Sequence, residues 1–235
     1  MIEGMRLIGE ALRTRAGMEY LITCPELVKS DYGRSLIGQA EKAGIEIIQL
    51  SPNAFMSLAA KEGPQGLLAV VVMQTVGFEE YARLGGVWVA VDSIQDPGNL
   101  GSVMRSLDGM GGSGIIILDE STDPFHPTAV RASTGAVFTQ KIILSSTEEL
   151  FEWKKEEQVH LVGTSCTTSQ NYRKYNYPER MILLIGSEQK GLPPEYLDKC
   201  DAVVTIPLYG SVDSLNLACA ASIILFEIIS QHKPD

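Results

Sequence analysis

The chain has few of the residues that hold metal ions or cross-link small secreted domains. Its 235 residues include four cysteines, widely separated and without a CxxC pair, and three histidines. This scatter favours neither a disulfide framework nor a zinc site, so no metal is expected. No apolar run approaches the roughly 18 residues that span a bilayer, and the first residues do not resemble a signal peptide. We therefore expect a cytoplasmic protein with no membrane segment.

Positive charge is also scarce. The chain has 19 Lys and Arg against 29 Asp and Glu, a net charge of −10, of which residues 1–75 carry −1 and residues 76–235 carry −9. Non-specific nucleic-acid binding draws its affinity largely from Lys and Arg that neutralise phosphates, so this composition argues against it. Any role with RNA must depend on a few local cations.

Apolar runs alternate with amphipathic stretches along the chain, which predicts an α/β protein. In residues 1–75 we expect three helices, at 4–16, 32–43 and 52–61, and three strands, at 20–23, 46–50 and 67–73. Residues 76–86 carry mixed polar residues and a Gly-Gly pair, and are predicted to be a linker.

A second alternation fills residues 87–235. It begins with the fully apolar run 87–91, which is typical of a parallel sheet covered on both faces. Further strands are expected at 114–118, 138–144, 159–163, 181–185 and 202–206, with helices from about 99 and at 127–135, 147–157 and 214–231.

Residues 109–114 match GxGxxG, the pattern of a dinucleotide-binding loop. That loop must follow a strand and open a helix, whereas this stretch is predicted to end a helix and precede a strand. We interpret it as a helix end and turn, which leaves a nicotinamide-dependent dehydrogenase as a remote alternative.

Two loops at predicted strand ends carry polar residues and glycines. In the first, Asn99 is expected to cap a helix that carries Arg105, and Gly101 to leave the helix start bare for an approaching ligand. In the second, Glu188 lies between Gly186 and Gly191. Taken alone, each loop is interpreted first as an ordinary capped helix or strand-to-helix turn.

A third stretch runs from Ile206-Pro207 to Ser214-Leu215-Asn216, where Ser214 is a candidate N-cap and Asn216 an amide among apolar residues. The helix that follows has an apolar face that suits either a dimer interface or a core; its residues are Leu217, Ala221, Ile224, Leu225 and Ile228.

Together, in order and spacing, the three stretches resemble the three motifs of the SpoU family of RNA ribose 2′-O-methyltransferases. Arg131-Ala132-Ser133 with Gly135-Ala136 matches another stretch usual in that family. The resemblance covers residues 87–231, and residues 1–73 more weakly resemble an L30e-like substrate-binding domain. It implies a small L30e-like α/β domain over residues 1–75 and, over 87–235, an S-adenosylmethionine-binding domain with a deep C-terminal trefoil knot. It also implies that relatives have a further N-terminal segment before the position of Met1.

The family resemblance also assigns roles to residues. It implies that S-adenosylmethionine is held mainly by backbone groups, at Thr164, Gly186, Ile206, Leu208 and Leu215. It makes Arg105 the residue that engages the ribose 2′-hydroxyl, supported by Asn99, Glu188 and Asn216.

The resemblance further implies an RNA partner and a homodimer. Ribosomal RNA is the leading substrate and transfer RNA the alternative. A catalytically silent RNA-binding relative is another hypothesis, because Ala218 stands where family members commonly have a serine.

Overall fold

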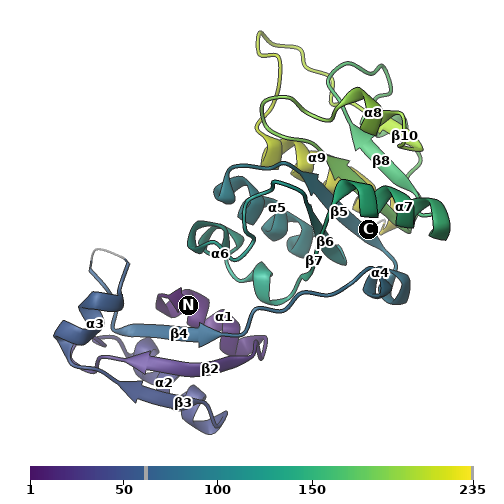
Figure 1. The fold of residues 1–235 in the computed structure, drawn as a ribbon. Coiled ribbons are helices and arrows are strands. Elements are labelled where there is room, and N and C mark those ends of the chain that lie inside the picture. The colour runs from purple at the N-terminus through teal and green to yellow at the C-terminus, as the bar shows by residue number, and fades with distance from the viewer. Residues whose placement is uncertain (61–62, 234–235) are drawn as a thin grey trace. The chain divides into compact units, whose positions relative to one another are not determined.

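The computed structural model describes residues 1–60 and 63–233 (Figure 1). The chain divides into two compact units, one of Met1–Gln74 with Val137–Thr139 and one of Thr75–Ala136 with Gln140–Asp235. Among the described helices, none is long and apolar enough to cross a membrane.

The first unit is a four-stranded sheet with helices. The strands are β1 (Ile2–Glu3), β2 (Met18–Thr23), β3 (Glu46–Gln49) and β4 (Leu67–Val71), in the order β1-β4-β2-β3. The helices are α1 (Met5–Arg13), α2 (Asp31–Lys42) and α3 (Pro52–Leu58). Ser30 and Ser51 cap α2 and α3 with their side chains, which explains where these helices begin. Phe55 of α3 is buried in a core with Ile22 and Leu68.

The second unit is built on a six-stranded sheet in which every pairing is parallel. Its strands are β5 (Val87–Asp92), β6 (Gly114–Leu118), β7 (Lys141–Ser145), β8 (Leu161–Thr164), β9 (Met181–Ile185) and β10 (Ala202–Val204). Every residue of β5, β6 and β9 is buried, because helices cover both faces of the sheet. The predicted α/β fold with a parallel sheet is confirmed.

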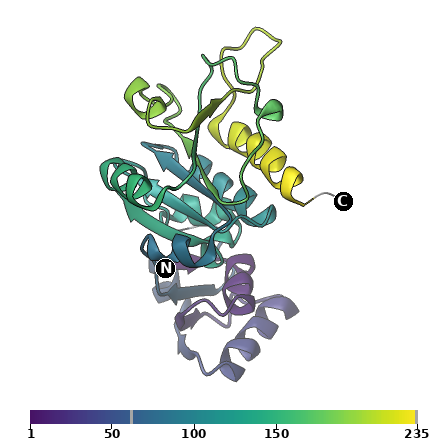
Figure 2. The ribbon, with the colours of Figure 1, turned by 90° about the vertical axis from the view of Figure 1, so that its right-hand side faces the viewer.

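Two groups of helices cover this sheet (Figures 1 and 2). On one face α5 (Pro97–Gly109) packs against α6 (Pro127–Ser133) and α9 (Leu217–His232). On the other face α4 (Glu79–Leu84), α7 (Thr147–Glu157) and α8 (Pro194–Leu197) share a core with Trp88 of β5. The short 3-10 helix η2 (Tyr172–Lys174) also belongs to this unit, whereas η1 (Ala136–Phe138) contains Ala136 of the second unit and two residues of the first.

The strand order is β10-β8-β9-β5-β6-β7. From β5 the chain builds outward through β6 and β7, and then crosses to build β8, β9 and β10 on the other side. The order therefore reverses between the neighbours β5 and β9. In open parallel sheets ligands bind at the carboxyl ends of the strands beside such a reversal, so this edge is where a site is expected.

The structure changes several predicted boundaries. Residues 76–86, predicted as a linker, contain α4, whose Tyr81 is buried with its ring 5.1 Å from that of Trp153. β7 begins at Lys141 because the residues before it form η1. The glycine stretch 109–114 closes α5 and leads into β6, as its interpretation as a turn predicted.

Candidate functional site

The loops that follow β5 and β9 meet at the point where the strand order reverses. Val91 of β5 pairs with Ile185 of β9, so both loops leave the same edge of the sheet. The first loop presents two consecutive backbone N–H groups to the Glu188 carboxylate in the second. Gln95 N lies 3.3 Å from Oε2, and Asp96 N lies 3.3 Å from Oε1. The carboxylate therefore joins the two strand ends.

Helix α5 begins two residues earlier than predicted, and Asp96, not Asn99, is its N-cap. Asp96 Oδ1 accepts hydrogen bonds from the N–H groups of Gly98 (2.6 Å) and Asn99 (3.4 Å), and Pro97 occupies the first helical position. Asp before Pro is a common helix-start signal, and Asp96-Pro97 provides it three residues before the predicted cap. Because Asp96 caps the helix, the Asn99 side chain is free to bond to residues of the other two motifs, Glu188 and Asn216.

A chain of side-chain hydrogen bonds links the three sequence motifs. Asn99 donates through Nδ2 to Glu188 Oε1 at 3.1 Å, and its Oδ1 accepts from Asn216 Nδ2 at 2.9 Å. These residues are 89 and 117 positions apart in the sequence. The structure thus brings together three of the four predicted catalytic residues in one contiguous relay.

Asn216 both caps a helix and belongs to this relay. Its Oδ1 accepts from the N–H groups of Ala218 (3.0 Å) and Cys219 (3.2 Å), so it is the N-cap of α9 in place of the predicted Ser214. The amide oxygen satisfies the free N–H groups of the helix while the amide nitrogen is directed at Asn99. The Asn216 amide, which was expected to need hydrogen-bond partners in this apolar stretch, is bonded at both its oxygen and its nitrogen.

The Glu188 carboxylate is held in its charged form. Partial burial acts to raise its pKa, but the hydrogen bond from Asn99 and those from the backbone of Glu188, Gln95 and Asp96 outweigh that effect, so the pKa lies below its ordinary value. Glu188 therefore accepts hydrogen bonds at neutral pH and does not serve as a proton donor there.

Arg105 lies on the solvent side of α5. Two other sides of α5 pack against helices. Gly101 faces α6, and the Ser106 hydroxyl lies 2.7 Å from that of Ser222 on α9. The Arg105 side chain is exposed, and none of the residues that the structure describes forms an ion pair or hydrogen bond with it. Its guanidinium group remains open to a ligand such as a phosphate.

Gly101 serves helix packing. A Cβ atom built there would overlap the carbonyl oxygen of Ala129, and it would lie 2.6 Å from Ala132 Cβ and 2.9 Å from Ser133 N. The prediction that Gly101 keeps the helix bare for a ligand is therefore wrong for this position, because α6 already fills that space.

The predicted cofactor residues lie at neighbouring strand ends. Val204 of β10 pairs with Thr164 of β8, and Thr164 Oγ1 donates to Leu184 O of β9 at 3.3 Å. Ile206 follows β10, and Gly186 follows β9. Three partly buried apolar side chains flank these loops: Ile206, Leu208 and Leu215. Backbone groups and apolar side chains are what a flat, neutral ring needs, so the residues fit the adenosine part of S-adenosylmethionine.

Gly186 is required by its own loop. A Cβ there would overlap the backbone of Gly191 and Leu192, and Gly191 N donates to Ser187 O at 3.0 Å. Any side chain at position 186 would therefore disturb the fold of the loop itself, because residues 186 and 191 lie so close together.

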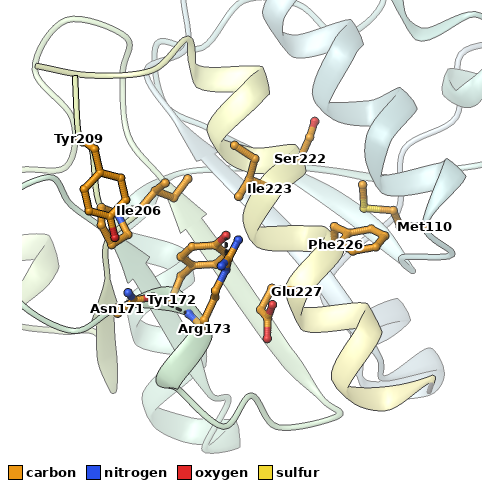
Figure 3. A pocket seen from close by; sticks show the side chains of 11 residues that line it. Met110, Asn171, Tyr172, Arg173, Ile206, Tyr209, Ser222, Ile223, Phe226 and Glu227 are labelled. Carbon is orange, nitrogen blue, oxygen red and sulfur yellow. Dashed lines mark hydrogen bonds between the residues drawn. The ribbon is translucent and has the colours of Figure 1, made fainter. Parts of the chain in front are cut away.

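An open pocket of about 690 Å³ lies beside the Ile206 loop (Figure 3). Its walls come from the C-terminal end of α5, the middle of α9, η2 and the loop after β10. They include Met110, Tyr172, Arg173, Ile206, Tyr209, Ile223 and Phe226. Tyr209 is 95% exposed and Phe226 is 65% exposed. The five apolar positions predicted on one face of the C-terminal helix, which suited either an interface or a core, are all buried within the protomer. Ile223 and Phe226 lie on the face turned to this pocket.

The fold and the site are those of an α/β protein in which polar loops meet at the reversal point of a parallel sheet. Residues 86–226 match the SpoU rRNA Methylase family, and residues 1–69 match the MRM3-like substrate binding domain. The chain belongs to the SpoU rRNA methylase family, as the three motifs predicted.

Relatives of known structure and name agree with this placement. The AdoMet-bound rRNA methyltransferase of Sinorhizobium meliloti has a TM-score of 0.85 and 31% identity, covering 99% of this chain and 87% of that one. The SpoU methyltransferase AviRb of Streptomyces viridochromogenes, in complex with AdoMet, has a TM-score of 0.84 and 29% identity, covering 98% and 89%. The 23S rRNA (guanosine(2553)-2′-O)-methyltransferase RlmP of Bacillus subtilis (strain 168) is 29% identical over 97% of this chain and 87% of its own length.

Proposed function

We propose that this protein transfers the methyl group of S-adenosylmethionine to a ribose 2′-hydroxyl of ribosomal RNA. The observation that carries the proposal is the relay from Glu188 through Asn99 to Asn216, which gathers the three family motifs beside the strand-order reversal. The names of the relatives and the AdoMet in two similar structures support this reading. They favour ribosomal over transfer RNA as the substrate.

S-adenosylmethionine supplies a methyl carbon already activated by its sulfonium, so the protein has to align the reactants and relieve the hydroxyl of its proton. We assign its binding to the backbone around Gly186, Ile206, Leu208 and Leu215, with Thr164 at the rim.

Arg105 is proposed as the catalytic residue. Its guanidinium keeps its proton at any ordinary pH and is unsuited to be a base. Arg105 instead pairs with the phosphate beside the target ribose and orients the 2′-hydroxyl, whose proton passes to that phosphate or another acceptor. Asn99, Glu188 and Asn216 hold the start of α5, and so position Arg105.

The proposal extends to the two parts of the chain. Residues 1–75 serve as the L30e-like domain that recognises a folded RNA element, and residues 87–235 as the methyltransferase domain with the trefoil knot of its family. Unpaired RNA regions expose the base edges that a protein reads. The cytoplasm, where ribosomal RNA is met without a membrane barrier, is the proposed location.

A homodimer is also proposed, with the second copy covering the pocket beside α9. The exposed Phe226 and Tyr209 with the adjacent Ile223 form an apolar surface at that pocket, and burying such a surface favours association.

The test is transfer of labelled methyl from S-adenosylmethionine to purified 23S ribosomal RNA and, in parallel, to transfer RNA. We expect label at one ribose of 23S RNA, where the methylated 2′-oxygen makes the adjacent phosphodiester bond resistant to alkali. Label in transfer RNA alone would favour the alternative substrate.

The silent RNA-binding hypothesis rests on Ala218. The Asn216 cap and relay are complete without a hydroxyl there, which favours the active enzyme. Calorimetry decides between them: no cofactor binding at millimolar concentration, together with no transfer, would support the silent relative.

A further inference from the structure

The turn that follows β5 also forms hydrogen bonds with the loop after β6, which is not part of the relay. Gln95 donates through Nε2 to the backbone carbonyls of Glu120 (2.9 Å) and Ser93 (3.3 Å). Glu120 belongs to the loop after β6, the strand on the other side of β5 from β9. One side chain therefore ties together the loops that follow two adjacent strands.

Ser121 acts on the same turn. Its hydroxyl accepts from Ile94 N at 3.2 Å and donates to Val91 O at 3.3 Å, while Thr122 N donates to Ile94 O at 2.7 Å. The turn itself contains Ser93 with φ +55°, a left-handed conformation that a non-glycine residue adopts only when its surroundings hold it there. The loop after β6 provides that hold.

The held turn presents the N–H groups of Gln95 and Asp96 to Glu188. Asp96 next caps α5, and Asn99 in the first turn of α5 completes the relay to Asn216. Any shift of residues 93–96 therefore moves both the carboxylate contact and the helix that carries Arg105.

We propose that Gln95 and Ser121 are positioning residues for methyl transfer. They fix the turn 93–96 so that Glu188, Asn99 and Arg105 stand in the geometry the reaction needs. This inference rests on the proposed function. Within residues 1–60 and 63–233, neither side chain forms a hydrogen bond with the loops after β8, β9 and β10 to which we assign the cofactor. Their loss should therefore slow the transfer step and leave cofactor binding unchanged.

The test uses Gln95→Met, which keeps the length of the side chain but removes its donors, and Ser121→Ala. Each should lower the single-turnover rate at saturating cofactor by about tenfold, the change expected when a hydrogen bond that supports the transition-state geometry is lost. Calorimetry should give a cofactor Kd within about twofold of wild type. A twofold change corresponds to less free energy than the loss of one hydrogen bond. Gln158→Met, the same exchange at the exposed end of α7, should match wild type in both measurements.

A double-mutant cycle separates positioning from general loosening of the fold. Combined with Glu188→Gln, Gln95→Met should add little further loss, because both act on the same contact. Independent, additive losses, or weaker cofactor binding with an unchanged transfer rate, would overturn the inference. Wild-type protein that methylates no RNA would remove the proposed function; an active wild type with an equally active Gln95→Met would remove only this inference.

Discussion

Arg105 is exposed on α5, away from the sides of the helix that pack against α6 and α9. Its side chain can therefore be replaced without disturbing the fold. Arg105→Ala should leave cofactor affinity unchanged and lower single-turnover methyl transfer by about 100-fold, the range for loss of one charged transition-state contact. Arg105→Lys should recover little, because an ammonium cannot reproduce the planar fork of a guanidinium.

Lys155→Ala is the matched control for Arg105, since Lys155 is an exposed cation of the same unit, on α7. It should transfer methyl at the wild-type rate. A wild-type rate for Arg105→Ala as well would remove Arg105 from the active site.

Asp92 ends β5 as a carboxyl group that is only 5% exposed. Burial raises its pKa and the nearby Asp119 adds to the rise, although hydrogen bonds from Ser93 and Thr147 oppose it. A carboxyl whose pKa is higher in the folded than in the unfolded state costs stability as pH rises from the unfolded pKa through the folded one. At neutral pH the charged Asp92 carboxylate should therefore lower the stability of the folded wild-type protein.

Asp92→Asn removes the charge while its amide oxygen can still accept from Ser93 and Thr147. We expect the variant to have a higher Tm than wild type at pH 7, and the gap to shrink as the pH falls toward about 4, near the unfolded-state pKa. Thermal unfolding across that range is the measurement. A gap that widens on acidification would contradict the assigned pKa direction.

At the scale of elements, α5 and α6 pack through the bare Cα of Gly101. Gly101→Ala should lower the free energy of unfolding by about 1–3 kcal/mol, because its methyl group overlaps the Ala129 carbonyl and α6 must move. Gly109, at the end of the same helix, has open space around it. Gly109→Ala should raise stability by about 0.5–1 kcal/mol through helix propensity.

Denaturant unfolding of both variants, followed by helix content, tests this pair. If Gly101→Ala were as stable as wild type, the close approach of α6 to α5 would be refuted. The pair also separates the packing effect from the general effect of adding a methyl group to α5.

For the whole molecule, the proposed homodimer has its interface at the face around Phe226. Leu217 and Ile224 are buried within the protomer, so glutamate there would disrupt the fold and say nothing of an interface. Phe226→Glu changes a side chain that is 65% exposed. It should turn a dimer into a folded monomer, because an unpaired carboxylate would be buried between the copies.

Leu144→Glu is the control for Phe226, because Leu144 is 53% exposed on β7, away from that pocket. It should remain dimeric in light scattering. A wild-type protein that runs as a monomer at micromolar concentration would contradict the proposed assembly.

Local patterns predicted most elements of the larger unit. The runs 114–118 and 181–185 became β6 and β9 with the predicted bounds, because strands buried on both faces are apolar at every position. Helix α7 also has its predicted bounds, and the structure explains them by a capping box between Ser146 and Glu149. The predicted starts of α5 and α9 are wrong because two candidate capping residues lie near each start: Asp96 and Asn99 at α5, and Ser214 and Asn216 at α9.

The sequence by itself determined the α/β class, the family and the short motifs from which the site is built, since these depend on local periodicity and spacing. Only the tertiary structure decided what each motif residue contacts. Asn99 reaches Glu188 and Asn216 because β9 lies beside β5 and α9 packs on α5. Gly101 resembles a ligand-approach glycine in the sequence, yet it faces α6. Such contacts are set by strand order and helix packing between distant segments, which local side-chain chemistry does not encode.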